Sequence, residues 1–175
     1  MKIKSIVFGL SMMMVTFSSL AVDGYKNVKF GTPLKTLQDA GWCSWKKYND
    51  TNIKGMDSYT CSNFKFSGAD TLAMAFFLNG KFQRLAISVN NGIDALSSSL
   101  VKKYGEPSSR FTQSEIESVQ SNGGTISVKF DNDTVILAVS RDVKNNSELT
   151  QLIYSSVDYD TILKQVQIKN MENDL

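Results

Sequence analysis

Two cysteines are the residues whose types and spacing first suggest chemistry. Cys43 lies between two tryptophans in the segment Trp42-Cys43-Ser44-Trp45, and Cys61 is the other cysteine of the chain. Such a pair can form a disulfide, bind a metal or carry out redox catalysis. Redox catalysis usually uses Cys-x-x-Cys, and a zinc site needs further ligands such as histidine, which this sequence lacks entirely. We therefore predict a Cys43–Cys61 disulfide, formed in an oxidising compartment.

The absence of histidine also excludes whole classes of enzyme mechanism. Neither a Ser-His-Asp nor a Cys-His arrangement is possible, and no His-ligated metal site can form. The chain has no G-x-S-x-G motif and no Walker-type phosphate loop. A hydrolase based on paired carboxylates is the remaining route, with Glu115, Glu117 and Asp142 present but not distinguished by any pattern. We predict no cofactor and no enzymatic activity.

The segment Phe-Asp-Asn-Asp-Thr-Val at 130–135 resembles the nucleophile motif of haloacid-dehalogenase-type phosphatases. That family needs a large doubly wound α/β domain after the motif, and too little chain follows Val135. We interpret Asn132-Asp133 as a type I′ turn between two paired strands. Calcium binding by Asp131 and Asp133 is also disfavoured, because the regularly spaced oxygen ligands of a calcium loop are missing.

The N-terminus has the pattern of a bacterial secretory signal peptide. Lys2 and Lys4 precede an uncharged apolar stretch at 6–17, and Ser19-Leu20-Ala21 supplies small residues for cleavage after Ala21. The apolar stretch is too short to span a membrane, and no cysteine follows it to carry a lipid. We predict that residues 1–21 are removed and that a soluble protein reaches the periplasm, without stable membrane insertion.

The charge balance of the remaining chain disfavours polyanionic partners. The sequence has 19 basic and 17 acidic residues, and two of the basic residues, Lys2 and Lys4, belong to the signal peptide. The predicted mature chain is therefore neutral, and nucleic acid is not an expected partner. We predict a single domain at 22–169 and a polar tail at 170–175.

The disulfide suggests a specific hairpin. Segments 42–48 and 56–64 are predicted to pair with Cys43 opposite Cys61. The same register places Trp45 opposite Tyr59 and Lys47 opposite Asp57, both favourable cross-strand pairs. Direct cross-strand disulfides are geometrically tight, so a shifted register remains open.

A second hairpin is predicted at 71–89, with its turn at Asn79-Gly80. Regular pairing places one apolar set on the core face: Leu72, Met74, Phe76, Leu85, Ile87 and Val89. The opposite face is mixed and carries Phe77, Phe82 and Arg84 among small residues.

The remaining elements follow from capping residues and periodicity. Helices are predicted from Thr32-Pro33 to Gly41, from Asn91 to Tyr104, and from Asp158 or Asp160 onwards. Strands are predicted at 114–121, 125–130, 135–140 and 149–155. This order indicates an α+β fold with antiparallel sheet and helices packed on one face, in which an α-β-β-β unit occurs twice.

Three short motifs resemble those of small exported bacterial proteins: V-x-F-G-x-P-L at 28–34, the N-G-K hairpin at 78–82, and L-x-x-K-Y-G-x-P at 100–107. The α-β-β-β order also resembles the BamE-like envelope fold. This resemblance implies an envelope-assembly accessory or an inhibitor-like protein, and it implies no active site.

We therefore predict a protein-binding module of the inhibitor, immunity or envelope-accessory type, whose partner is another envelope protein. The alternatives are a small-ligand-binding protein and, less favoured, a cell-wall hydrolase. Aromatic and arginine side chains dominate binding hot spots. The candidate surface is Trp45 and Tyr59 beside the disulfide, with Phe77, Phe82 and Arg84 on the central hairpin. The competing interpretation is that both patches are structural, with Phe77 and Phe82 packed under a helix.

Overall fold

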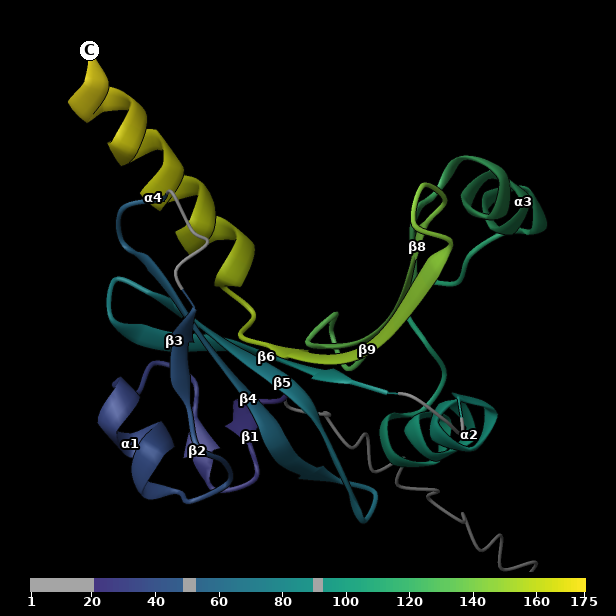
Figure 1. The fold of residues 1–175 in the computed structure, drawn as a ribbon, viewed down its shortest axis with the longest axis horizontal. Coiled ribbons are helices and arrows are strands. Elements are labelled where there is room, and N and C mark those ends of the chain that lie inside the picture. The colour runs from purple at the N-terminus through teal and green to yellow at the C-terminus, as the bar shows by residue number, and fades with distance from the viewer. Residues whose placement is uncertain (1–20, 49–52, 90–92) are drawn as a thin grey trace, which may run out of the picture.

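The computed structural model describes residues 21–48, 53–89 and 93–175. Within these ranges the chain forms a seven-stranded antiparallel sheet, a two-stranded sheet and four helices (Figure 1). The predicted α+β class is confirmed. The predicted signal peptide up to Leu20 and the helix cap at Asn91 lie outside the described residues.

The elements have the following bounds. The strands are β1 (Gly24–Tyr25), β2 (Val28–Lys29), β3 (Lys46–Tyr48), β4 (Met56–Phe66), β5 (Ala69–Leu78), β6 (Lys81–Ser88), β7 (Gly124–Phe130), β8 (Val135–Asp142) and β9 (Ser147–Ser155). The helices are α1 (Leu34–Asp39), α2 (Ile93–Tyr104), α3 (Gln113–Asn122) and α4 (Tyr159–Asp174).

The large sheet consists of two meanders. Its strand order is β3-β4-β5-β6-β9-β8-β7, so the meanders β4-β5-β6 and β7-β8-β9 meet through their third strands, β6 and β9. A helix precedes each meander, α1 before the first and α3 before the second. The chain therefore repeats a helix followed by a three-stranded meander, with β3 added at one edge. The second repeat begins with α3 and not, as predicted, with the helix that ends at Tyr104.

One face of the sheet, the covered face, packs against α1, α2 and the small β1-β2 sheet (Figure 1). Leu37 of α1, Val28 of β2 and Leu100 of α2 are buried against it. The strands contribute the rest of this core: Phe64, Ala73, Ala75, Phe77, Phe82, Leu85, Ile87, Val135, Leu137, Leu152 and Tyr154.

A β-bulge changes which residues of the β5-β6 hairpin reach this core. Phe77 pairs with Phe82 as predicted across Asn79-Gly80, but Phe76 pairs with Arg84, so Gln83 is an extra residue on β6. Beyond the bulge every pairing is shifted by one residue, and a one-residue shift exchanges faces. The predicted core set is therefore split between the faces. Leu85, Ile87 and Val89 are buried, whereas the even-numbered side chains of β5 lie on the opposite face.

That opposite face, the open face, carries α4 at one end of the strands (Figure 1). Tyr159, the first residue of α4, stacks on Arg84 of β6, with 3.4 Å between the guanidinium carbon and the ring centroid. Val166 is buried further along the helix. The helix runs to Asp174, so it includes most of the segment predicted as a polar tail, and Asn170 donates a hydrogen bond to the Lys54 carbonyl at 2.9 Å.

The prediction of a strand at 114–121 was wrong, because this segment is helix α3. Its start is fixed by a capping box. The Thr112 hydroxyl accepts from the Glu115 amide at 3.3 Å, and the Glu115 carboxylate accepts from the Thr112 amide at 2.6 Å. The helix begins where the T-x-x-E signature indicates.

Candidate binding surface

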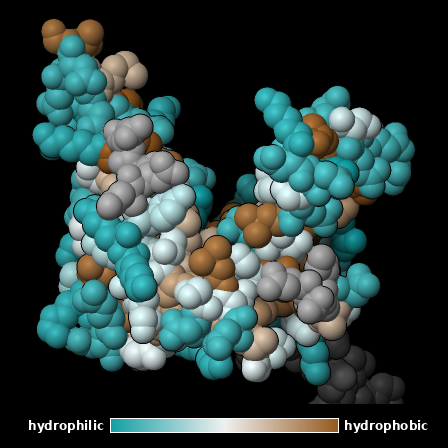
Figure 2. Space-filling model, in the orientation of Figure 1, coloured by the Kyte–Doolittle hydropathy of each residue, from teal (hydrophilic) through white to brown (hydrophobic). Residues whose placement is uncertain are grey.

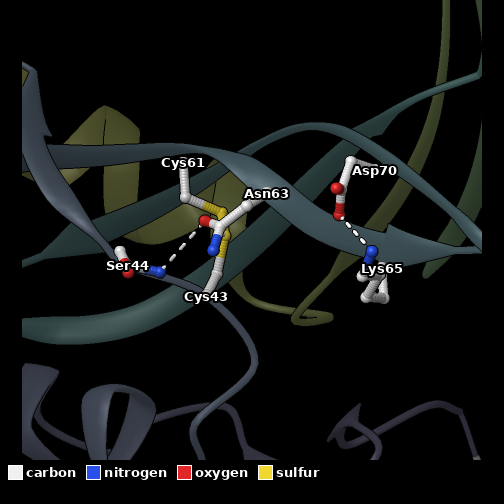
Figure 3. The surroundings of a disulfide bond; sticks show 6 residues. All are labelled: Cys43, Ser44, Cys61, Asn63, Lys65 and Asp70. Atoms are coloured by element: carbon white, nitrogen blue, oxygen red, sulfur yellow. Dashed lines mark hydrogen bonds and ion pairs between the residues drawn. A yellow bond between two sulfur atoms is a disulfide. The ribbon is translucent and has the colours of Figure 1, made fainter.

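The disulfide forms between Cys43 and Cys61, with the two Cα atoms 6.1 Å apart (Figure 3). It ties the loop before β3 to the middle of β4. The amide of Ser44 donates to the side-chain oxygen of Asn63 at 3.3 Å, which holds the same loop beside the bond. The ion pair Lys65–Asp70, at 2.8 Å, lies further along the β4-β5 hairpin.

The pairing of β3 with β4 differs from the predicted register by two residues. Lys47 pairs with Tyr59, and the ordered strand begins only at Lys46, so Trp45 does not face Tyr59 in a ladder. The ion pair Lys47–Asp57 still forms diagonally, at 2.7 Å. The disulfide thus joins strand β4 to a loop, which relieves the tight geometry of a direct cross-strand pair.

Both tryptophans pack on Phe64. The ring centroids of Trp42 and Trp45 each lie 6.3 Å from that of Phe64, which is fully buried. An irregularity between Cys61 and Phe64 gives β4 one extra residue, so both side chains reach the covered face. Trp42 donates to the side chain of Asn27 at 3.1 Å, while the indole N–H of Trp45 is buried with no partner in the described part of the chain. The Trp45 side chain therefore packs against the core beside the disulfide.

The other predicted aromatics pack on the same core, Tyr59 with part of its side chain exposed and the two phenylalanines fully buried. Tyr59 stands edge-on to Phe77, with 5.4 Å between centroids, and Phe77 contacts Phe82 at 5.6 Å. Phe77 is 1% exposed and Phe82 is 0% exposed. The structure thus places these two phenylalanines in the core, where they cannot contact a partner.

Arg84 is the predicted residue that does lie on the open face. Its Nε donates to the Ser155 hydroxyl at 3.1 Å, and its Nη2 lies 3.4 Å from a carboxylate oxygen of Asp160. Burial lowers the pKa of Arg84, and the neighbouring Tyr159 and Asp160 act in the opposite direction. Burial also raises the pKa of Tyr159. The guanidinium therefore attaches the start of α4 to strands β6 and β9.

The carboxylates considered for hydrolysis or for calcium binding have local structural roles. Glu115 caps α3, and the hydrogen bonds from Thr112 lower its pKa. Asp142 accepts hydrogen bonds from Asn145 and Lys144 in the turn after β8, and those from Asn145 contribute most to lowering its pKa. Asp131 accepts from the Val22 amide at 2.7 Å, which fixes the start of the described chain to the β7-β8 turn. In the described ranges no group of three or more His, Cys, Asp or Glu residues is placed to bind a metal.

The open face carries a continuous apolar row across the sheet. Successive pairings align Thr60, Met74, Ala86, Ile153 and Ile136 on neighbouring strands β4, β5, β6, β9 and β8. Two apolar residues of β5, the half-buried Phe76 and the exposed Leu72 (47%), flank this row. Met74, Ile136 and Ile153 are each only partly buried. A partly exposed apolar band, made of Met74, Ile153 and Ile136 with the buried Ala86 between Met74 and Ile153, therefore runs across the middle of the sheet.

The open face of the sheet borders a hollow. Figure 2 shows the molecule hollowed between the end that carries α4 and the end that carries α3 and β8, with hydrophobic side chains on the floor. The sheet itself curves to make this shape (Figure 1). One wall is α4, held by Arg84, and the other is the upturned part of β7, β8 and β9.

Cavities of the size of a small-ligand site lie elsewhere in the described part of the chain. One of about 400 Å³ lies between α2 and the end of the β4-β5 hairpin, lined by residues such as Phe66, Thr71 and Leu96. Two buried polar residues, Thr71 and Ser88, line this cavity, and the Thr71 hydroxyl donates to the Ser88 carbonyl at 2.7 Å. The Thr71 hydroxyl is therefore already paired within the protein, whereas a typical ligand site offers several convergent polar groups to its ligand.

Comparisons with known proteins place the chain in a family. Residues 25–174 match a family model described as "Uncharacterised protein". The chain belongs to this family. A relative from Haemophilus influenzae, also described as an uncharacterized protein, is 31% identical over the full length of both chains. No solved structure matches significantly. In the part of the chain that the structure describes, no helix is both long and apolar enough to cross a membrane.

Proposed function

We propose that this family member is an exported, non-catalytic protein that binds another protein of the bacterial envelope through its open face. The observation that carries the proposal is the apolar band of Met74, Ile136 and Ile153, which is partly exposed on the open face. Contiguous exposed apolar surface of this kind marks interaction sites on soluble proteins. The hollow fits a protruding segment of a partner better than a flat surface.

The cellular setting of the proposal comes from the sequence. The signal-peptide pattern of residues 1–21 supports export to the periplasm, and the Cys43–Cys61 bond fits an oxidising compartment. The proposal also draws on the resemblance of the predicted α-β-β-β order to BamE-like envelope accessory proteins. The proposed partner is therefore an envelope protein, met by an inhibitor-like or accessory-like module.

Site-specific photocrosslinking in cells tests this function. A benzophenone amino acid is placed at Ile153 on the open face. The matched control carries it at Lys35, an exposed residue of α1, the helix that packs on the covered face. We expect one stoichiometric protein adduct from position 153 and none from position 35. Equal labelling from both positions, or no adduct from position 153, would contradict protein binding at the open face. Screening with cell-wall fragments and small periplasmic ligands would then follow.

A further inference from the structure

The two edges of the large sheet are protected very differently. Exposed edge strands invite pairing with another chain, so proteins usually shorten them or place lysine or proline on them. Edge strand β3 has three residues, two of which are Lys46 and Lys47. Edge strand β7 has seven, and its stretch Gly124-Thr125-Ile126-Ser127-Val128 contains neither charge nor proline. By these criteria β3 is protected from pairing with another chain, and most of β7 is not.

The backbone groups on the free side of β7 can be identified from the register. The Lys129 carbonyl accepts a hydrogen bond from the Ser108 amide at 2.8 Å, and the Lys129 amide donates to the Ser109 carbonyl at 3.5 Å. Both groups of Lys129 therefore point away from β8. Outward-pointing groups recur at every second residue of a strand, and the β7-β8 pairing is regular throughout. The N–H and C=O groups of Thr125 and Ser127 therefore also point outward, and within the described residues no backbone group pairs with them.

The chain itself occupies the first position on this edge and then leaves it. Ser109 forms an isolated antiparallel bridge with Lys129. The Ser108 hydroxyl donates to Asp133 at 2.5 Å, which lowers the pKa of that carboxyl group and secures the segment. Three residues after Ser109 the Thr112 capping box starts α3, which turns the chain away. From Val128 back to Gly124, the edge of β7 therefore has no strand beside it among the described residues. The bridge at Ser109 marks where such a strand would start.

A groove runs along the vacant edge. It has a volume of about 340 Å³ and lies between β7 and α3, with Phe111, Val119 and Ile126 as its apolar lining. Phe111 is 38% exposed, and no side chain of α3 is fully buried. A helix with so little of its surface buried gains packing if another segment fills the groove beside it.

We propose that the free edge of β7, with α3 beside it, is a β-augmentation site that takes an extended peptide segment of a partner protein. The segment runs antiparallel to β7 in continuation of Ser109. Two of its residues exchange backbone hydrogen bonds with Thr125 and Ser127. The residue between them is apolar and enters the groove against Ile126 and Val119, as in other strand-addition complexes. A second copy is the less suitable occupant, because it would bring its own α3 to the same place.

The proposal rests on the protein-binding function above but uses a different surface, so the two can fail separately. The probe is the capped peptide acetyl-Thr-Ser-Val-Ser-Thr-amide, titrated to about 5 mM into the full isotope-labelled protein, a range that covers weak single-strand binding. We expect saturable amide shifts confined to Gly124–Val128, Phe111 and Val119. At saturation, hydrogen exchange of the Thr125 and Ser127 amides should slow by at least about tenfold.

Matched changes in both molecules identify the edge. Methylating the backbone nitrogens of the two peptide serines should abolish binding, whereas methylating that of the valine should not. Ser127→Pro removes an outward N–H without touching the β8 pairing and should abolish binding, while Ser127→Ala should retain it. If Ser127→Pro does not fold, Val119→Glu against Gln120→Glu gives the same contrast on α3.

Three results would overturn the inference. Absence of shifts at Thr125 and Ser127, or binding that survives serine methylation, would exclude strand addition of a peptide. Conversion of a dimer into a monomer by Ser127→Pro in sedimentation would show that the occupant is a second copy. An adduct from Ile153 without a peptide response would remove this site and leave the open-face function, and the reverse result would remove only that function.

Discussion

Replacing Arg84 with alanine should detach α4 from the sheet. Arg84 connects the two halves of the structure, because its guanidinium stacks on Tyr159 at 3.4 Å, donates to Ser155 of β9 at 3.1 Å and pairs with Asp160. Its side chain is only 22% exposed, so most of these contacts are shielded from water. Truncation also leaves a gap beneath the first turn of α4, where Tyr159 is 4% exposed.

The expected loss can be worked out from these contacts. A desolvated cation–π contact contributes up to about 2 kcal/mol. A hydrogen bond from a charged donor contributes about 1.5–3 kcal/mol. The ion pair adds less than about 1 kcal/mol, because the Asp160 side chain is 90% exposed. These contributions overlap, so we expect the free energy of unfolding to fall by about 2–4 kcal/mol.

Urea denaturation followed by far-ultraviolet circular dichroism measures this loss, and amide exchange along 159–170 locates it. Arg84→Lys keeps the charge but not the planar stack, so it should fall between the wild type and Arg84→Ala. Asp160→Asn, the control for the exposed ion pair, should cost less than about 1 kcal/mol. An Arg84→Ala protein as stable as the wild type, or one with unchanged exchange in α4, would refute the assigned role.

Three further perturbations test the rest of the structure. Replacing Cys43 and Cys61 together with serine should lower the unfolding free energy by about 3 kcal/mol in chemical denaturation, as expected for opening a loop of this size; an unchanged midpoint would mean the bond does not form. Phe82→Ala should cost about 3–5 kcal/mol, since Phe82 is fully buried among Phe30 and Phe77, and a mild loss would show that the site is not core. Burial raises the pKa of Tyr154 above its ordinary value of 10.0. Because the neutral phenol is favoured in the folded state, stability should be complete below about pH 10 and decline above it, and Tyr154→Phe should weaken that decline in denaturation series from pH 8 to 11.

Much of the element order could be predicted from local signals, because those signals act within a few residues. Asn79-Gly80 fixes a hairpin turn, and α2 ends at Tyr104 before Gly105 and Pro107. The apolar residues of segment 114–121 alone are compatible with a strand, and the capping box before them indicates a helix. Ile116 and Val119 have helical spacing, and the T-x-x-E signature at 112–115 was available in the sequence.

The candidate surface could not be predicted in the same way, because one bulge residue decides it. Gln83 has no sequence feature that marks it as an insertion, yet its presence exchanges the faces of β5 relative to β6. Regular pairing without the bulge predicts Met74 and Phe76 in the core and leaves Phe77 as a surface candidate. Both alternations are apolar along β5, so hydrophobicity alone could not distinguish them. Arg84 was the useful signal, since a charged residue in a central strand needs a partner such as Tyr159.

The helices that follow the two meanders pack on different faces of the sheet. β6 and β9 occupy equivalent positions, and each is followed by a helix, yet α2 packs on the covered face and α4 on the open face. The chain turns toward the open face just after β9. There the Ser156 amide donates to the Gln83 carbonyl at 2.8 Å, and Arg84 stacks on Tyr159. The bulge that exposes Met74 and Phe76 is thus the same feature that directs α4. One local irregularity produces both the apolar floor of the hollow and its wall, so Arg84→Ala should lower the Ile153 crosslink as well as the stability.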